Sequence, residues 1–215
     1  MQYISIDQCS KIIKNNTILD NITLELCQHK IYGFVGRNGS GKTVLFKTIA
    51  GLVYPTSGIV YVNGEQVVFN RHYPVKLGIT IENNGLWPHL NAFENLSVLA
   101  AIRRECSPED IRRTIARVGL CDDQKKFAKY SLGMKQRLML AQAIMEKPDL
   151  LILDEPTNAL DREGIQLFKE IIAAERERGA TVLISSHSLE NFESFCDNII
   201  YMENGRIIDH RENIL

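Results

Sequence analysis

The sequence lacks any apolar run that approaches the roughly 20 residues a helix needs to cross a bilayer. Its first residues, Met1–Asp7, have neither the basic region nor the long apolar region of a secretion signal. If this protein works on a membrane, we therefore expect another chain to supply the membrane part.

Cysteine is sparse and shows no pattern. The chain has five cysteines, and no two of them form a C-x-x-C pair. This spacing supports neither a zinc site nor a disulfide framework, and it favours reduced thiols in a cytosolic protein.

An excess of one charge is also missing, because 25 Lys and Arg residues stand against 26 Asp and Glu residues. The formal net charge of -1 gives no overall electrostatic reason to expect a nucleic acid partner. The chain of 215 residues is 45% hydrophobic, which suffices for one principal core with an embedded lobe.

The first third of the chain is rich in short β-like runs that are separated by Gly and Asn turn signals. They predict a small N-terminal β region. The runs are Tyr3–Ile6, Ile22–Cys27, Ile31–Val35, Gly58–Val62 and Gln66–Phe69.

Helical periodicity replaces this pattern from Leu90 to about Arg137. One helix is expected to begin with Ser107 as its N-cap, Pro108 at its first position and two acids in its first turn. We predict an inserted helical lobe here.

Two continuous apolar runs follow, Leu150–Leu153 and Thr181–Ile184, and an amphipathic stretch from Arg162 to Arg178 lies between them. Strands that are apolar on both faces are typical of a parallel sheet covered by helices. The predicted fold class is therefore α/β with a mostly parallel sheet.

The segment with the most chemical information is Gly36-Arg37-Asn38-Gly39-Ser40-Gly41-Lys42-Thr43, which fits G-x-x-x-x-G-K-[ST] between a strand-like run and a helix-like run. Its glycines permit conformations in which several N–H groups converge on phosphate oxygens. Lys42 can add a charge for the β and γ phosphates, and Thr43 can ligate Mg²⁺. A ligand-free tight turn is the alternative, but the complete pattern in this context favours a nucleoside triphosphate.

Two acids, Asp154 and Glu155, end the run Leu150–Leu153 at the sheet edge where α/β proteins bind ligands. Asp154 is suited to hold Mg²⁺ indirectly, through water or through another ligand of the ion, and Glu155 to polarise the water that attacks the γ phosphate. Taken alone, the pair also fits two acids that cap a loop.

These two motifs and three further segments resemble those of the ABC ATPases, in the order that the family has along the chain. The resemblance covers essentially the whole chain. The family signature is similar to Tyr130-Ser131-Leu132-Gly133-Met134-Lys135-Gln136-Arg137. The loop after the second phosphate motif resembles Pro156-Thr157-Asn158-Ala159-Leu160-Asp161, and the switch-histidine segment resembles Ser185-Ser186-His187.

The resemblance implies a P-loop NTPase core with a mostly parallel sheet, an N-terminal antiparallel β region and an inserted helical subdomain. We expect a single ABC ATPase domain over residues 1–215. Its ATP-binding core would cover about 1–85 and 138–215, and its helical subdomain about 86–137.

A shared site is also implied, in which two ATPase subunits pack head to tail and each buries ATP between its own glycine turn and the partner's signature. Ser131 would offer a hydroxyl and Gly133 an N–H to the γ phosphate. His187 would hydrogen-bond the same phosphate and align Glu155. Asp161 would contact the partner's glycine turn. Taken alone, Ser131-Leu132-Gly133 favours an ordinary helix cap, and a histidine after an apolar strand favours a polar cap.

The implied cofactors are ATP and Mg²⁺. The implied partners are a second copy of this chain and a membrane permease, which would hold the protein at the cytoplasmic face of the cell membrane. A nucleic acid is not expected.

Four positions depart from the family pattern. Leu132 and Met134 replace a Gly and a Gln of the signature. Glu82 replaces a glutamine, and a carboxylate there can ligate Mg²⁺ but repels a triphosphate. Ile13 stands where the family commonly stacks an aromatic ring on adenine, and an aliphatic side chain loses the preference that stacking gives.

Glu82, the signature and the segment Leu86–Leu96 resemble the bacitracin-resistance and lantibiotic-immunity branch, which suggests export of antimicrobial peptides. Two alternatives remain: a nucleotide-dependent clamp with vestigial hydrolysis, and a soluble ABC ATPase that acts as an assembly factor. Glu155 and His187 argue against the clamp. The lack of coiled-coil insertions and of a second cassette argues against a role in repair or translation.

Overall fold

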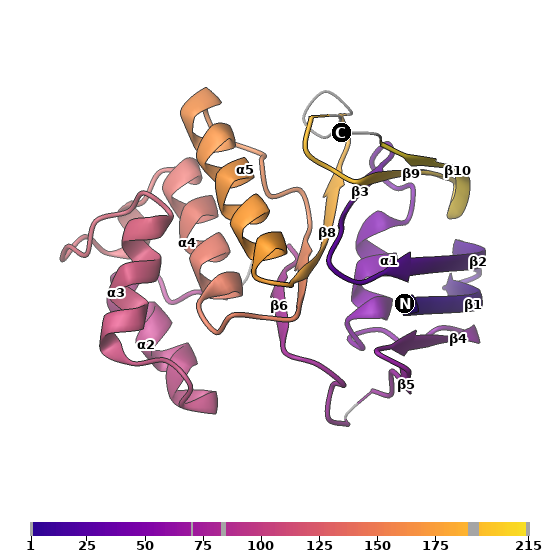
Figure 1. Cartoon of the computed structure of the whole chain (residues 1–215), viewed down its shortest axis with the longest axis horizontal. Helices are drawn as coiled ribbons and strands as arrows, with labels where there is room; N and C mark the ends of the chain where they lie inside the picture. The colour runs from indigo at the N-terminus through magenta and orange to yellow at the C-terminus, as the bar shows by residue number, and fades with distance from the viewer. Residues whose placement is uncertain (1, 70, 83–84, 189–193, 214–215) are drawn as a thin grey trace.

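Two β-sheets form the frame of the molecule, seen in a computed structural model that describes residues 2–69, 71–82, 85–188 and 194–213 (Figure 1). An antiparallel sheet has the strand order β2-β1-β4-β5. Its strands are β1 (Gln2–Ile13), β2 (Asn16–Cys27), β4 (Ser57–Val62) and β5 (Glu65–Gln66). The predicted N-terminal antiparallel region is therefore confirmed.

The strands of this sheet differ in extent from the predicted runs. β1 continues past Ile6 to Ile13, because it pairs with β2 on one side and with β4 on the other. Its hairpin turn has positive φ at Lys14 and Asn15, as a two-residue type I′ turn requires. The predicted strand Gln66–Phe69 is wrong after its first residue, because Phe69 lies in a turn and packs on the Tyr54 ring, with 5.1 Å between centroids.

The second sheet has the order β10-β9-β3-β8-β7-β6, and every neighbouring pair is parallel except the hairpin β9–β10. The mostly parallel sheet was predicted, and β7 coincides with the predicted run. The strands are β3 (Ile31–Val35), β6 (Leu77–Thr80), β7 (Leu150–Leu153), β8 (Thr181–Ser186), β9 (Asn198–Glu203) and β10 (Arg206–Glu212).

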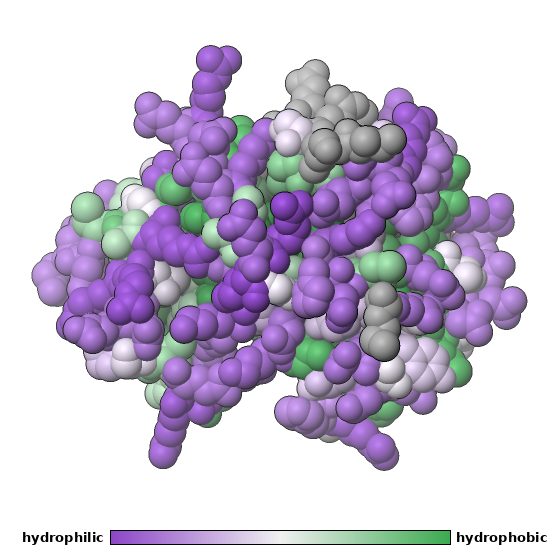
Figure 2. Space-filling model, in the orientation of Figure 1, coloured by the Kyte–Doolittle hydropathy of each residue, from purple (hydrophilic) through white to green (hydrophobic). Residues whose placement is uncertain are grey.

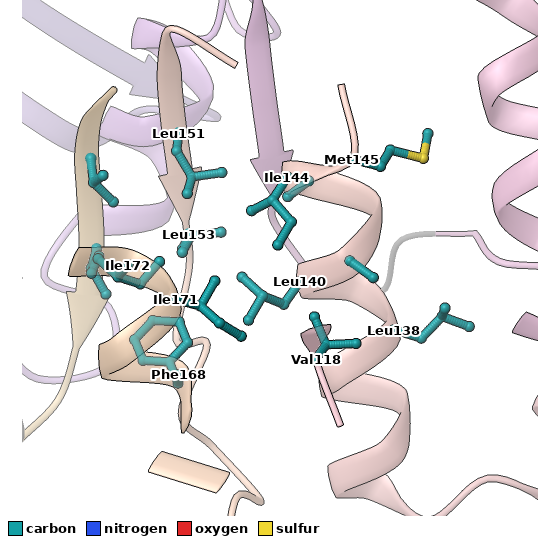
Figure 3. Packing of buried hydrophobic residues seen from close by; sticks show 14 of the residues in the cluster. Val118, Leu138, Leu140, Ile144, Met145, Leu151, Leu153, Phe168, Ile171 and Ile172 are labelled. Atoms are coloured by element: carbon teal, nitrogen blue, oxygen red, sulfur yellow. The ribbon is translucent and has the colours of Figure 1, made fainter. Parts of the chain in front are cut away.

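Apolar side chains cover both faces of the parallel strands. In β7, Leu151 and Leu153 belong to the cluster on the helical side, whereas Leu150 and Ile152 belong to the cluster on the other side. Figure 3 shows the helical side, where Leu140 and Ile171 approach Leu153. Burial on two faces leaves only the ends of these strands for polar chemistry.

Helices occupy both sides of the parallel sheet (Figure 1). α1 (Lys42–Ile49) buries its apolar side chains in the cluster shared with the antiparallel sheet. α4 and α5 lie on the other side, with α2 and α3 beyond α4. The bounds are α2 (Ala92–Arg103), α3 (Pro108–Arg117), η1 (Phe127–Lys129), α4 (Leu132–Ile144) and α5 (Arg162–Glu177).

Helix caps match the sequence pattern. The Ser107 hydroxyl accepts from the N–H of Asp110, and the Asp110 carboxylate accepts from the N–H of Ser107, which confirms the predicted cap of α3. We placed the end of the helical subdomain at about residue 137, which lies inside α4. The division of the chain into a core and a helical subdomain stays a prediction.

The surface in Figure 2 is dominated by hydrophilic side chains, with hydrophobic residues in small separate areas. None of the described helices combines the length and the apolar character that crossing a membrane requires.

All five cysteines are free thiols, and burial raises the pKa of Cys9 and of Cys196, so these two act as packing side chains.

A buried acid joins α3 to α5. The carboxylate of Glu175 is 2% exposed and lies 2.5 Å from Nη1 of Arg117 and 2.9 Å from Nε of Arg178. Acids are almost never fully buried unless they are paired. These two guanidinium groups therefore stabilise the charge, and the pair with Arg117 fixes α3 to α5.

Replacing this acid with its amide is expected to destabilise the fold. In Glu175→Gln, two guanidinium groups that are 37% and 31% exposed would lose a charged acceptor, which should lower the free energy of unfolding by about 2 kcal/mol. Urea denaturation measures the change. Glu177→Gln, an exposed position on the same helix, is the matched control and should change the midpoint little. Equal midpoints for the two variants would contradict this assignment.

Candidate nucleotide-binding site

The turn between β3 and α1 depends on glycine for two different reasons. Gly39 and Gly41 have φ of 81° and 102°, in the left-handed region that favours glycine. Gly36 lies against β9, where an added β-carbon would be 2.3 Å from the carbonyl oxygen of Met202. Other residues would strain the turn at the first two positions and would clash at the third.

The middle of the turn faces solvent. Arg37, Asn38 and Gly39 are exposed, whereas Ser40 is buried. Residues 36–40 line one wall of an open pocket of about 420 Å³, and residues of β9 and β10 line the other. The outer surface of the turn is thus accessible to a ligand.

Lys42 begins α1 and folds back over its own loop. Its ammonium group donates to the carbonyl oxygens of Gly36 at 2.6 Å and Arg37 at 3.2 Å. The same group lies 3.8 Å from a carboxylate oxygen of Glu155, and the residue is only 5% exposed. A nearly buried cation is therefore held inside the turn.

Asp154 connects three segments of the chain. Its Oδ2 accepts from the Thr43 hydroxyl at 2.7 Å, and its Oδ1 accepts from the Ser185 hydroxyl. Asp154 follows β7, and Ser185 lies near the end of the neighbouring strand β8. The parallel strands therefore bring the two predicted phosphate motifs together at one edge of the sheet.

Glu155 lies between the loop and His187. Its backbone N–H donates to the Ser185 hydroxyl at 2.9 Å, and its Oε2 lies 3.1 Å from Nδ1 of His187. Its φ of 50° is unusual for a residue with a side chain. Gln136 of α4 donates to its carbonyl oxygen at 3.4 Å. These contacts fix the backbone of Glu155, while His187 remains more than half exposed.

The oxygen atoms beside the loop suit Mg²⁺. The hydroxyl of Thr43 and the carboxylate of Asp154 are hard donors in direct contact, and Mg²⁺ commonly takes one or two protein oxygens together with phosphate oxygens and water. Within the described ranges, no group of three His, Cys, Asp or Glu residues could hold a metal ion. The residues present therefore fit an ion that arrives with a phosphate ligand.

Ser131 and Gly133 lie at the start of α4 and line a different pocket from the glycine turn. The Ser131 hydroxyl caps the helix by accepting from the N–H of Met134 at 3.2 Å. A β-carbon on Gly133 would lie 3.1 Å from the carbonyl oxygen of Ala159, and Leu132 is 71% exposed. The signature therefore presents a helix N-terminus to the surface, beside an open pocket of about 630 Å³.

Asp161 lies on the rim of the same pocket and caps α5 by accepting from the N–H of Gly164 at 2.8 Å. An Nη2 of Arg137 lies 3.7 Å from its carboxylate. Its contact with a partner's glycine turn stays a prediction.

Two departures from the family pattern have clear surroundings. Glu82 follows β6, and its carboxylate lies 2.7 Å from the ammonium group of Lys47 on α1. Ile13, at the end of β1, is 43% exposed. Ile13 pairs with Asn16 of β2. Farther along β2, the carbonyl oxygen of Ile18 lies against Gly41, so β2 connects the region of Ile13 to the glycine turn.

Sequence reasoning gave no individual role to three residues that hold the site. Ser185 bonds both Asp154 and Glu155, Gln136 bonds Glu155, and Gly205 donates to the carbonyl of Ser40 at 3.1 Å. A hydroxyl at the end of a buried strand was a usable signal for Ser185. No local pattern pointed to the other two.

Comparison with known proteins gives one family. The sequence family described as ABC transporter matches residues 19–158. The uncharacterized ABC transporter ATP-binding protein YybJ of Bacillus subtilis (strain 168) is 46% identical over 92% of this chain and 91% of its own length. The bacitracin transport ATP-binding protein BcrA of Enterococcus faecalis is 39% identical over 97% of this chain and 69% of its own. The lantibiotic transport ATP-binding protein SrtF of Streptococcus pyogenes is 37% identical over 97% of this chain and 90% of its own length.

Solved structures share the fold. The dimeric structure of MJ0796, a bacterial ABC transporter cassette, has a TM-score of 0.86 at 24% identity and covers 97% of this chain and 98% of its own. A structure of the ATP binding subunit of an ABC transporter has a TM-score of 0.85 at 26% identity, and the match covers 98% of this chain and 90% of that one. The family match covers more than half of the chain, and it agrees with the glycine turn and its acidic neighbours. The chain therefore belongs to the ABC transporter family, as one of its ATP-binding ATPase subunits.

Proposed function

We propose that this chain uses ATP hydrolysis to drive a separate membrane permease that transports a peptide antibiotic. A continuous network of polar contacts at one sheet edge supports this: Lys42 meets Glu155, Glu155 meets His187, and Asp154 meets Thr43. These contacts hold phosphate-binding and water-activating groups in one place before any ligand arrives.

The glycine turn binds the triphosphate. Its N–H groups, at the positive end of α1, donate to phosphate oxygens, while the ammonium group of Lys42 supplies the charge. Thr43 and Asp154 would hold Mg²⁺, which would supply positive charge to the phosphate oxygens when bound. Lys42 exchanges the carbonyl oxygens of Gly36 and Arg37 for phosphate oxygens.

Glu155 is the general base of the reaction. Its carboxylate accepts a proton from the water that attacks the γ phosphate, and His187 fixes the direction of that carboxylate from the other side. A protein that only closed on a nucleotide would need neither group. Their contact therefore supports hydrolysis over a clamp with vestigial activity.

The complete site contains two chains. Ser131 and Gly133 lie at a helix N-terminus and line a pocket that shares no residue with the pocket beside the glycine turn. Such an N-terminus is suited to a phosphate that is held elsewhere. A second copy, packed head to tail, presents its signature to the γ phosphate held by the first copy.

The names of two relatives support the cargo. BcrA is named for bacitracin transport and SrtF for lantibiotic transport, and each matches 97% of this chain. The permease places the chain at the cytoplasmic face of the cell membrane. Copurification from membranes, followed by identification of the attached multi-span protein, tests this part of the proposal. Recovery of the chain without such a protein would contradict it.

Glu155→Gln should slow hydrolysis but preserve ATP binding. An amide cannot take the proton of the attacking water, so turnover should fall by about 10² to 10⁴. Phosphate release and ATP-dependent dimer formation, measured on the same preparation, separate the two effects. Unchanged hydrolysis would remove Glu155 as the base.

Lys42→Ala should weaken triphosphate binding itself, because the cation inside the turn disappears. We expect at least about a tenfold rise in the dissociation constant for ATP, as for the loss of one charge-assisted contact to a phosphate. Equilibrium binding of a fluorescent ATP analogue measures it. Lys47→Ala, on the same helix but outside the turn, is the control, and full affinity in Lys42→Ala would refute the phosphate contact.

Glu82→Gln should leave ATP affinity within about twofold, because its carboxylate contacts Lys47 in a largely exposed ion pair of small energy. The ATPase rate in the presence of the permease should change, since this residue follows the edge strand β6. A large loss of affinity for ATP with Mg²⁺ would show that Glu82 is a metal ligand, as we predicted from the sequence.

A further inference from the structure

Two residues in the loop after β7 have a backbone conformation that side chains disfavour. Glu155 has a φ of 50° and Ala159 a φ of 71°, both in the left-handed region. Residues with a β-carbon stay in this region only where surrounding contacts hold them, and such positions cluster at functional sites. The contacts of these two residues therefore show what keeps the general base of the proposed function in place.

Helix α4 contacts the loop at both of these residues. Nε2 of Gln136, in the second turn of α4, donates to the carbonyl oxygen of Glu155 at 3.4 Å. Gly133, in the first turn, lies so close to the loop that an added β-carbon would be 3.1 Å from the carbonyl oxygen of Ala159. One helix thus supports both left-handed residues.

The backbone of Glu155 has two further hydrogen bonds. Its carbonyl oxygen also accepts from the N–H of Asn158 at 3.3 Å, and its own N–H donates to the Ser185 hydroxyl at 2.9 Å. Asn158 belongs to the same loop, and Ser185 belongs to β8. Of these three partners, Gln136 alone comes from a helix, so its hydrogen bond is the one that depends on where α4 lies.

We propose that Gln136 is a positioning residue for Glu155. Its amide holds the Glu155 peptide against α4, so the position of α4 sets the direction of the carboxylate that accepts the proton. This role rests on the proposed function, in which the signature at the start of α4 meets the nucleotide of the second copy. Ser131 and Gln136 are five residues apart on one helix, so a single rigid element joins that contact to the base of its own chain.

Turnover and ATP binding, measured separately on the purified chain, test this role. Gln136→Met keeps a side chain of similar length but loses the donor, so kcat should fall about 5- to 10-fold, the range for one hydrogen bond. The affinity for a fluorescent ATP analogue should not change, because Gln136 contacts no phosphate-binding group. Gln136→Lys supplies a donor again and should recover most of the rate.

Gln142→Met is the matched control, because it makes the same exchange at another half-buried position of α4 and should behave like the parent. A kcat in Gln136→Met equal to that of the parent would overturn the role of Gln136 and leave the proposed function intact. An equal loss of rate in Gln136→Lys would overturn the role of the donor. An equal loss in Gln142→Met would show a general effect on α4 instead.

ATP-driven dimer formation separates the base from the interface. In the Glu155→Gln background, adding Gln136→Met should leave the dimer unchanged in sedimentation velocity, because the hydrogen bond lies within one chain. Weaker dimers would show that Gln136 acts on the interface, and would overturn its role toward Glu155. If the parent hydrolysed no ATP, the proposed function would fail, and the role of Gln136 with it.

Discussion

The carboxylate of Asp154 is the contact on which the site depends. One oxygen accepts from Thr43 in the helix after the glycine turn, and the other accepts from Ser185 in β8. It therefore fixes the turn against the sheet with hydrogen bonds to a charged group, which are stronger than neutral ones. The groups that we propose to bind phosphate are therefore held in position by contacts within the chain, so binding need not order them.

The apolar core explains why the chemistry is confined to one edge. Strands such as β7 are buried on both faces, so a charged side chain in their middle would lack a partner. Polar residues follow only where the strands end. Because neighbouring strands are parallel, their ends coincide, and Asp154 and Ser185 meet there without any distortion of the sheet.

In the proposed function the site is divided between two surfaces, which would give the cassette a way to sense its nucleotide. The glycine turn and its acids are assembled within one chain, while Ser131 caps α4 beside a separate pocket. Neither surface alone surrounds a triphosphate. A closed dimer would therefore be stabilised by the γ phosphate and destabilised by its loss, which links hydrolysis to a change of shape.

The sequence alone determined the elements whose rules are local. The glycines within residues 36–43 predicted a turn suited to phosphate. An apolar run predicted β7, and Ser107 with Asp110 predicted the start of α3. Tertiary structure decided the rest, because the decisive contacts join distant residues: Thr43 meets Asp154 across 111 positions, and the same acid meets Ser185 across 31. The length of β1 and the pairing of Glu82 with Lys47 depended in the same way on neighbours that no local pattern names. Backbone preference acts between adjacent residues, whereas strand register and packing decide which distant side chains share a place.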